Sequence, residues 1–327
     1  MSEWDKTIVI DLNNTSSAET CPVCKTVLEP DPQRSHTLRC PACNYIKTQK
    51  VMIAPGQIVG NKYRILSLLN CGGYGDLYLC HPLTDAATRY VLKVLRSASH
   101  SGKRRFRREA MLLSTIQDNE RIARIIDFWE SGDETFIIME YIRGQNLRQI
   151  AQSFKMDEHA ILQIAKEVVH ALKDIWEQYA IIHRDIKPEN IMLDERFHLK
   201  LLDFGLSKQC EGEIESAITM EQSSLGTPGF MSPEQFLDFK NADFRTDIFS
   251  LGATLFFLLT KTQPFNGTTL MDIYKDTKKN SPPPAKSFQD KCSPACIKLI
   301  RKMMAFSPDK RHSSYGELLQ EIKELLS

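Results

Sequence analysis

Acidic and amide side chains that can handle both a metal ion and a proton are concentrated in two nearby segments. The first reads His183-Arg184-Asp185-Ile186-Lys187-Pro188-Glu189-Asn190, and the second reads Asp203-Phe204-Gly205. Carboxylate and amide oxygens are hard donors that suit Mg²⁺, and a carboxylate can also accept a proton from a hydroxyl group. We therefore expect Asp185, Asn190 and Asp203 to form one site.

These two segments resemble the catalytic loop and the Asp-Phe-Gly sequence of eukaryotic-type (Hanks-type) protein kinases. The resemblance implies transfer of the γ-phosphoryl group of ATP, with Asn190 and Asp203 binding Mg²⁺ or Mn²⁺ and Asp185 orienting the acceptor hydroxyl. It assigns Lys187 to the transferred phosphate, and a lysine here is typical of the serine/threonine branch. Expected substrates are proteins with serine or threonine acceptors, including the chain itself.

The segment Gly226–Glu234 resembles the substrate-side end of a kinase activation segment, with Ser232 in place of the usual alanine. Within it, the resemblance implies that Thr227 contacts the catalytic aspartate and lysine, and that Glu234 forms a buried ion pair with Arg311. Kinases of small molecules also carry a His-x-Asp loop that ends in asparagine, but they lack such a segment. The family resemblance therefore favours a protein kinase.

Residues 247–252 resemble the helix that supports the catalytic loop in this family, with Phe249 in place of the common tryptophan. Arg184 precedes the catalytic aspartate, and in the family such an arginine receives a phosphate on the activation segment. Phosphate on Ser223 or Ser224 would then also meet the basic run 103–108 and order the segment. A solvated basic helix face explains that run equally well. Ser216 and Thr219 are further candidate phosphorylation sites.

Glycines between two strand-like runs, in Leu69–Tyr78, would let backbone N–H groups close over phosphates without a Cβ in the way. The segment departs from the kinase glycine loop at Asn70 and at Leu77. Because asparagine adopts positive φ more readily than most residues, Asn70 is compatible with the turn. Taken alone, the same sequence pattern is also compatible with an ordinary glycine-rich hairpin that binds no phosphate.

Lys93 occupies the position of the strand lysine that holds the α and β phosphates in kinases, and Glu109 is its expected partner. The resemblance places the adenine between two lobes, with Met139 guarding the back pocket and Glu140-Tyr141-Ile142 as the hinge. Val91 stands where many kinases carry alanine. The expected nucleotide-binding residues are Asn70, Gly72, Gly73, Gly75, Leu77, Val91, Lys93, Met139, Glu140, Ile142 and Met192.

Four cysteines near the amino terminus form two pairs with the spacing C-x2-C-x15-C-x2-C. Such spacing is typical of a zinc ribbon, in which two tight turns present four thiolates to a tetrahedral metal. We expect Cys21, Cys24, Cys40 and Cys43 to bind a structural Zn²⁺. Two disulfides and bound iron are the alternatives. The ribbon carries several basic residues, which could suit nucleic acid. Because it lacks a series of aromatic side chains that could stack on bases, we expect it to dock a protein partner instead.

The pattern of hydrophobic residues divides the chain into four parts. We expect a mobile tail at 1–20, the zinc ribbon at 21–43, a linker at 44–58 and an α+β, two-lobed kinase domain at 59–327. Its strand-rich N-lobe would cover 59–139, its hinge 140–144 and its helical C-lobe 145–327. Strands are predicted at 63–66, 77–79, 90–94, 125–126 and 136–139, and helices around Ile161–Ile175, Asp247–Leu259 and Tyr315–Leu326.

Composition excludes several other classes of protein. Lys plus Arg number 42 and Asp plus Glu number 41, so no global charge draws the chain to nucleic acid or to an anionic membrane. The first residues are acidic, and no apolar run approaches the roughly 20 residues that a spanning helix needs. Five of the nine cysteines are scattered without a framework pattern, which fits reduced thiols, so we expect a cytoplasmic protein without a membrane anchor.

Two other functions are compatible with the sequence. A pseudokinase scaffold would display the fold without turning over ATP, although the retained Lys93, Glu109, Asp185, Asn190 and Asp203 favour activity. Alternatively, the zinc ribbon would be the main functional part, acting as a nucleic-acid or partner-binding adaptor that the kinase domain regulates.

Overall fold

The computed structural model describes the chain from Thr26 onward, with gaps. The described residues are 26–27, 29–30, 37–39, 41–42, 46–48, 53–72, 75–96, 111, 114, 116, 119–131, 134–204, 228–237, 242–288 and 290–327. The chain divides into two compact units, Met1–Ala54 and Pro55–Ser327. Within the described residues, no helix combines the length and apolar character needed to cross a membrane.

The first unit contains a three-stranded antiparallel sheet. Its strands are β1 (Glu29–Pro30), β2 (Thr37–Arg39) and β3 (Ile46–Thr48), paired in that order. Pro41 and Ala42 form an exposed turn between β2 and β3. Two of the strands therefore lie within the predicted ribbon, and β3 lies within the predicted linker 44–58.

The second unit begins with a six-stranded antiparallel sheet of order β4-β5-β6-β7-β9-β8. Burial alternates along β6, as expected for a strand with one face against a core. The prediction of a strand-rich N-lobe is confirmed, although the strands are longer than predicted. They are β4 (Ile58–Val59), β5 (Tyr63–Gly72), β6 (Gly75–Pro82), β7 (Tyr90–Arg96), β8 (Ile125–Ser131) and β9 (Glu134–Glu140).

Three aromatic rings stack across this sheet. The ring centroids of Tyr63 and Trp129 lie 6.0 Å apart, and those of Trp129 and Phe136 lie 5.1 Å apart, both pairs nearly parallel. Trp129 and Phe136 are directly paired on neighbouring strands. Cross-strand aromatic pairs of this kind stabilise a sheet beyond the area that they bury.

A second, small sheet carries the catalytic loop. It consists of β10 (Gly144–Asn146), β11 (Ile191–Asp194) and β12 (Leu199–Leu201), all antiparallel. The short helix η1 (Pro188–Asn190) leads directly into β11, and Asp203 follows β12. Strand pairing thus brings the two ends of the site together, because the loop and the Asp-Phe-Gly segment flank the same hairpin.

The remaining chain is helical, which confirms the prediction of a helical C-lobe. Helix α3 buries Ile161, Ile164, Val168, Leu172 and Ile175, the face predicted from their spacing. Helix α6 is buried along nearly its whole length, so it forms the centre of the core. The helices are α2 (Leu147–Ser153), α3 (Glu158–Tyr179), α5 (Pro233–Leu237), α6 (Arg245–Thr260), α7 (Leu270–Asn280), α8 (Pro294–Met303) and α9 (Tyr315–Leu326).

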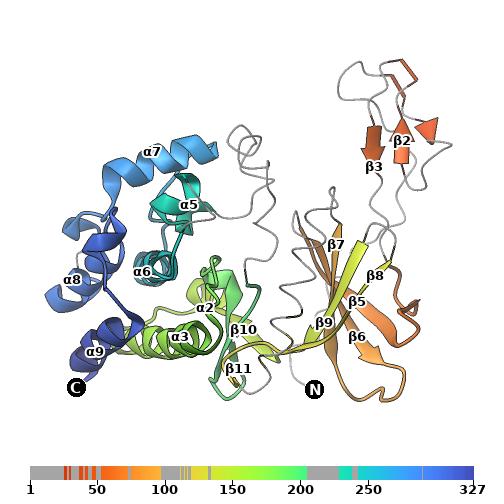
Figure 1. The fold of residues 1–327 in the computed structure, drawn as a ribbon, viewed down its shortest axis with the longest axis horizontal. Coiled ribbons are helices and arrows are strands. Elements are labelled where there is room, and N and C mark those ends of the chain that lie inside the picture. Colours follow the sequence, from red (N-terminus) through yellow and green to blue (C-terminus); the bar gives the residue numbers. More distant parts are fainter. Residues whose placement is uncertain are drawn as a thin grey trace. The chain divides into compact units, whose positions relative to one another are not determined.

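Figure 1 shows α3, α6, α8 and α9 gathered into one bundle, with β10 and β11 beside α2 and α3. Three further short helices, η3 (Pro228–Phe230), η4 (Ala285–Phe288) and η5 (Pro308–Lys310), connect the longer ones. The proline-rich run at 281–284 follows α7, and η4 and α8 come after it.

Candidate active site

One face of the large sheet carries several of the predicted nucleotide-binding residues. Leu77, Lys93 and Ile137 lie opposite one another on β6, β7 and β9. Leu79, Val91 and Met139 form the next row on the same face, because directly paired residues point to the same side of a sheet. The strand register therefore brings Leu77, Val91, Lys93 and Met139 together.

The glycine-rich segment is a hairpin between β5 and β6. Asn70 lies in β5 opposite Leu77, and its Oδ1 accepts a hydrogen bond of 2.8 Å from the N–H of Cys71. The left-handed backbone lies instead at Gly75, with φ of 131°. Asn70 therefore replaces the first glycine in an extended strand, where no positive φ is required.

Lys93 and Asp203 form an ion pair that joins the sheet to the segment after β12. The Nζ atom of Lys93 lies 2.6 Å from Oδ1 of Asp203, and the two side chains are 12% and 31% exposed. Asp203 adopts a positive φ of 44°, uncommon for a residue with a side chain. Such strain is stored where surrounding structure over-determines the backbone, and functional sites are the usual place.

Asp185 is held by two side chains of its own loop. Nδ2 of Asn190 donates 2.9 Å hydrogen bonds to the backbone carbonyl and to Oδ2 of Asp185. Nζ of Lys187 lies 2.9 Å from the same Oδ2. These contacts fix the carboxylate beside a cation in a partly buried site.

The backbone of the catalytic loop is anchored by Asp247 of α6. Its carboxylate accepts 2.8 and 2.7 Å hydrogen bonds from the N–H groups of His183 and Arg184. The hydroxyl of Tyr315 donates to it as well, at 3.3 Å. Burial raises the pKa of Asp247 to about 6, although the two backbone donors oppose this shift. Arg184 is thereby held at a φ of 64°.

The side chain of His183 is buried and neutral, and it packs beneath the loop. Its ring stacks on Phe204 with centroids 4.4 Å apart, and its Nε2 pairs with the carbonyl of Leu202 at 2.9 Å. Burial lowers the pKa of His183 to about 4. The histidine therefore links the loop to the Asp-Phe-Gly segment without carrying charge.

A buried amide connects the end of the activation segment to the catalytic loop. Oε1 of Gln235 accepts hydrogen bonds of 3.0 and 3.2 Å from the N–H and the hydroxyl of Ser232. Its Nε2 donates 2.9 Å to the carbonyl of Arg184. The Ser232 hydroxyl also contacts Thr246 at the start of α6. Our sequence reasoning missed Gln235, because only the fold brings it to Arg184.

The predicted pair between Glu234 and Arg311 is present and bidentate. The two guanidinium nitrogens lie 2.6 and 2.8 Å from the two carboxylate oxygens. Arg311 has no exposed side-chain surface and lies over the ring of Phe249 at 4.9 Å. Phe249 thus supplies an aromatic face for the cation, as the common tryptophan would.

Comparison with known proteins identifies this arrangement. Residues 63–324 match the family described as protein kinase domain. The chain belongs to this family. It is 34% identical over 281 residues to serine/threonine-protein kinase pkn3 of Myxococcus xanthus, covering 82% of the chain and 50% of pkn3. It is 31% identical over 272 residues to serine/threonine-protein kinase PrkC of Bacillus subtilis, covering 82% of the chain and 41% of PrkC.

The match therefore spans at most about half the length of these curated kinases. A crystal structure of Rad53 1-466 in complex with AMP-PNP superposes with a TM-score of 0.65 and 23% identity. It covers 81% of this chain and 66% of that one, and it shows that the two share the kinase fold.

The predicted hinge, residues 140–144, begins at the end of β9. Glu140 is the last residue of β9, and its backbone N–H donates 3.0 Å to the carbonyl of Arg124. Its carboxylate pairs with Lys200 at 2.7 Å. Within the described part of the chain, the backbone N–H of Ile142 makes no hydrogen bond. Met192 lies on β11 opposite Lys200.

Several predicted kinase residues lie outside the described part of the chain. They are Gly73, Glu109, Thr227, the four paired cysteines Cys21, Cys24, Cys40 and Cys43, and the candidate phosphorylation sites Ser216, Thr219, Ser223 and Ser224. The described cysteines Cys71, Cys80, Cys292 and Cys296 are free thiols.

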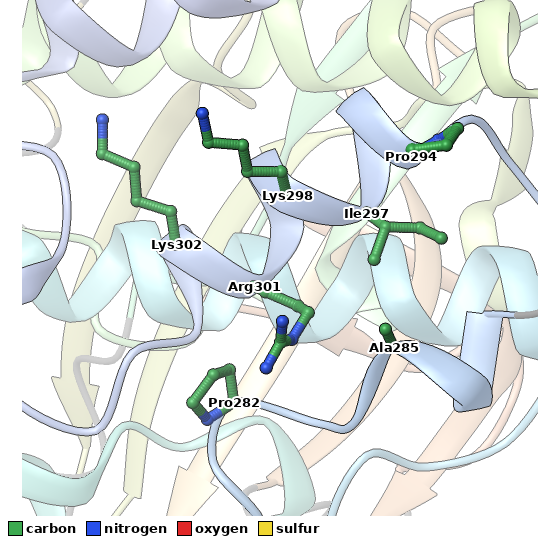
Figure 2. A pocket seen from close by; sticks show the side chains of 7 residues that line it. All are labelled: Pro282, Ala285, Pro294, Ile297, Lys298, Arg301 and Lys302. Atoms are coloured by element: carbon green, nitrogen blue, oxygen red, sulfur yellow. The ribbon is translucent and has the colours of Figure 1, made fainter.

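A separate cavity of about 430 Å³ lies in the helical lobe, between the proline-rich turn and α8 (Figure 2). None of the predicted site residues lines it. Its basic side chains come from one helix, and Nε of Arg301 already donates to the carbonyl of Pro283 at 3.0 Å. The cavity is lined by Pro282, Ala285, Pro294, Ile297, Lys298, Arg301 and Lys302.

Proposed function

We propose that this chain is an active serine/threonine protein kinase that transfers the γ-phosphoryl group of ATP to protein hydroxyls. The observation that carries the proposal is the paired arrangement of charges. Lys93 and Asp203 meet at 2.6 Å, and Lys187 and Asp185 meet at 2.9 Å. A scaffold has no need of two shielded ion pairs with metal-binding and proton-accepting groups, whereas phosphoryl transfer uses all four.

The donor set fits a hard cation such as Mg²⁺ or Mn²⁺. Because Nδ2 of Asn190 donates to Asp185, its Oδ1 is the atom that would bind metal, and Asp203 supplies carboxylate oxygens. Bound Mg²⁺ neutralises charge that develops on the phosphate oxygens. Lys93 would hold the α and β phosphates, and the proposed partner that orients it is Glu109.

Asp185 would position the acceptor hydroxyl and accept its proton. The hydrogen bonds from Asn190 and the anchoring of the loop by Asp247 restrict the carboxylate to one orientation. Lys187 lies close enough to place its ammonium on the transferred group while it remains beside Asp185. Positioning of this kind, together with fixed positive charge, accounts for most catalysis in phosphoryl transfer. Thr227 would complete the contacts around Asp185 and Lys187.

The face of the sheet that carries Leu77, Val91 and Met139 would bind the adenine. The N–H of Ile142, which makes no hydrogen bond among the described residues, supports a hinge contact to the base. Met192 would close the pocket from the other lobe. The glycine-rich hairpin, with Asn70, Gly72, Gly73 and Gly75, would cover the phosphates. Glu140 would act through its backbone carbonyl, since its N–H is already used.

The acceptor class rests on Lys187 and on the relatives, which are serine/threonine kinases. The test is incubation of the purified chain with radiolabelled ATP, Mg²⁺ and a protein substrate, beside the variant Asp203→Ala. Label on serine or threonine that the variant lacks would support the proposal. Equal labelling of the two proteins would contradict it and favour a scaffold.

We also propose that Cys21, Cys24, Cys40 and Cys43 bind a structural Zn²⁺ and that the ribbon docks a protein partner. Two features support the metal site: the cysteine spacing, and the exposed turn at Pro41 and Ala42, the two residues that separate the second pair in the sequence. Loss of zinc from Cys21→Ser/Cys24→Ser, measured by native mass spectrometry, would test it. A cytoplasmic location stays a prediction.

A further inference from the structure

Two thiols and a carboxylate converge at the start of α8, remote in sequence from the catalytic loop and from the amino-terminal cysteines. Cys292 precedes the cap residue Ser293 of α8, Cys296 lies in the first turn of that helix, and Glu158 lies in the first turn of α3. Their ligand atoms all lie within 4.8 Å of one another. We propose that these three side chains bind a thiophilic divalent cation, Zn²⁺, that ties the start of α3 to the start of α8.

The carboxylate of this cluster is already held in place. Oε2 of Glu158 accepts a 2.6 Å hydrogen bond from the N–H of Ser293, and Oε1 accepts a 2.7 Å bond from its hydroxyl. Carboxylates that bind metals are commonly oriented by such outer hydrogen bonds. Each oxygen keeps a second lone pair, so the contacts with Ser293 leave Glu158 able to bind a cation.

The distances between the three ligand atoms would suit zinc after a small movement of the side chains. Zinc binds sulfur at about 2.3 Å and carboxylate oxygen at about 2.0–2.2 Å, which sets tetrahedral donors about 3.5–3.8 Å apart. The present limit of 4.8 Å exceeds this by about one ångström. Cys292 precedes the helix cap Ser293, so its side chain can move without disturbing α8.

Burial gives the cluster a closed side and an open side. Cys296 is fully buried in the core of the helical lobe, whereas Cys292 and Glu158 are only partly buried. Pro294, which follows Ser293 at the beginning of α8 (Figure 2), is exposed. A cation can therefore enter beside Cys292, and water would fill the fourth position. Two thiolates favour zinc over Mg²⁺ or Ca²⁺, which prefer oxygen.

The test compares zinc content in the full-length chain, reduced, loaded with Zn²⁺ and freed of excess metal. Cys292→Ser/Cys296→Ser should hold one zinc fewer than the parent chain, both in the natural sequence and in the Cys21→Ser/Cys24→Ser background. This difference is independent of whether the amino-terminal cysteines bind metal. Cys71→Ser, which removes another free thiol, is the matched control and should keep the full zinc content.

Glu158→Gln tests the site without touching a buried thiol. In the Cys21→Ser/Cys24→Ser background it should weaken zinc binding at least tenfold and abolish the rise in melting temperature that Zn²⁺ produces in that background. Equal zinc content in the parent chain and in Cys292→Ser/Cys296→Ser would overturn the proposal. Recovery of a Cys292–Cys296 disulfide, seen by mass spectrometry, in a reduced and reloaded protein that takes no zinc at this site would overturn it too.

Discussion

Asp185 owes its orientation to neighbours that are close in the chain and to others that are far away. Asn190 and Lys187 belong to the same loop, and their side chains contact the carboxylate directly. Gln235 acts at longer range, since it holds the carbonyl of Arg184, the residue immediately before Asp185. A single buried amide thus links the loop to the end of the activation segment.

Replacing Gln235 by leucine should show how much this link contributes. The variant removes the hydrogen bond to the carbonyl of Arg184 and the hydrogen bond from the buried N–H of Ser232, and a buried polar group left unsatisfied costs about 1–3 kcal/mol. Unfolding in urea should show a lower stability, and turnover should fall because Asp185 is less restricted.

The matched control is Gln320→Leu on the exposed face of α9, where Gln320 hydrogen-bonds to Glu324 at 2.9 Å. Its stability should stay within about 0.5 kcal/mol of the parent chain. A Gln235→Leu protein as stable and as active as this control would show that the hydrogen bond to Arg184 contributes to neither stability nor turnover.

At the scale of elements, α6 is the support on which the site is assembled. It carries Asp247 at its first turn and is buried on nearly all sides by other helices. Gly252 lies within it, where an added Cβ would come within 2.8 Å of Cγ of Met304 and 2.9 Å of Cβ of Met303. The close approach of α6 to the end of α8 therefore requires glycine at this position.

Gly252→Ala should destabilise the protein although alanine favours helix. Overpacking costs about 1–3 kcal/mol, and the gain in helix propensity of about 1 kcal/mol offsets only part of it. Gly316→Ala in α9 is the control, because the nearest heavy atom to its added Cβ is Ser314 Oγ at 3.6 Å. Thermal unfolding should move in opposite directions for the two variants. A shift of both toward higher stability would refute the packing argument.

The prediction of elements from sequence succeeded where the signal is local. The spacing of apolar residues in α3 identified its buried face, and the prediction at 315–326 coincides with α9. The strands were underestimated: β5, predicted to end at residue 66, continues to Gly72 because its last residues pair with β6. Pairing partners far along the chain decide where a strand ends, and a local pattern does not contain them.

For the whole molecule, two buried groups should give opposing dependences of stability on pH. His183 has a pKa of about 4, below its ordinary 6.5, so its contribution to stability is lost as pH falls through this range. Asp247 has a pKa of about 6, above its ordinary 3.8, so its charged form is costly when buried and stability rises as pH falls through 6. Between pH 6.5 and 4 the two effects largely cancel.

The variant Asp247→Asn should reveal how much His183 contributes to the pH dependence of stability. The variant keeps the histidine and loses the opposing group, so its free energy of unfolding should fall more steeply between pH 6.5 and 4 than that of the parent chain. The difference between the two proteins should grow by about 3 kcal/mol across this range. Urea unfolding at several pH values measures it, and parallel profiles for the two proteins would contradict the assignment of opposite signs.

The sequence by itself determined the division into a strand-rich and a helical lobe, and its resemblance to the kinase family predicts the catalytic loop and the residues that bind ATP and metal. These depend on residue type and on spacing within short segments. Only the tertiary structure decided that Lys93 pairs with Asp203, that Gln235 holds Arg184 and that Glu158 lies beside Cys292 and Cys296. The reason is physical: these contacts join residues far apart in the chain, and their energies depend on burial that packing alone creates.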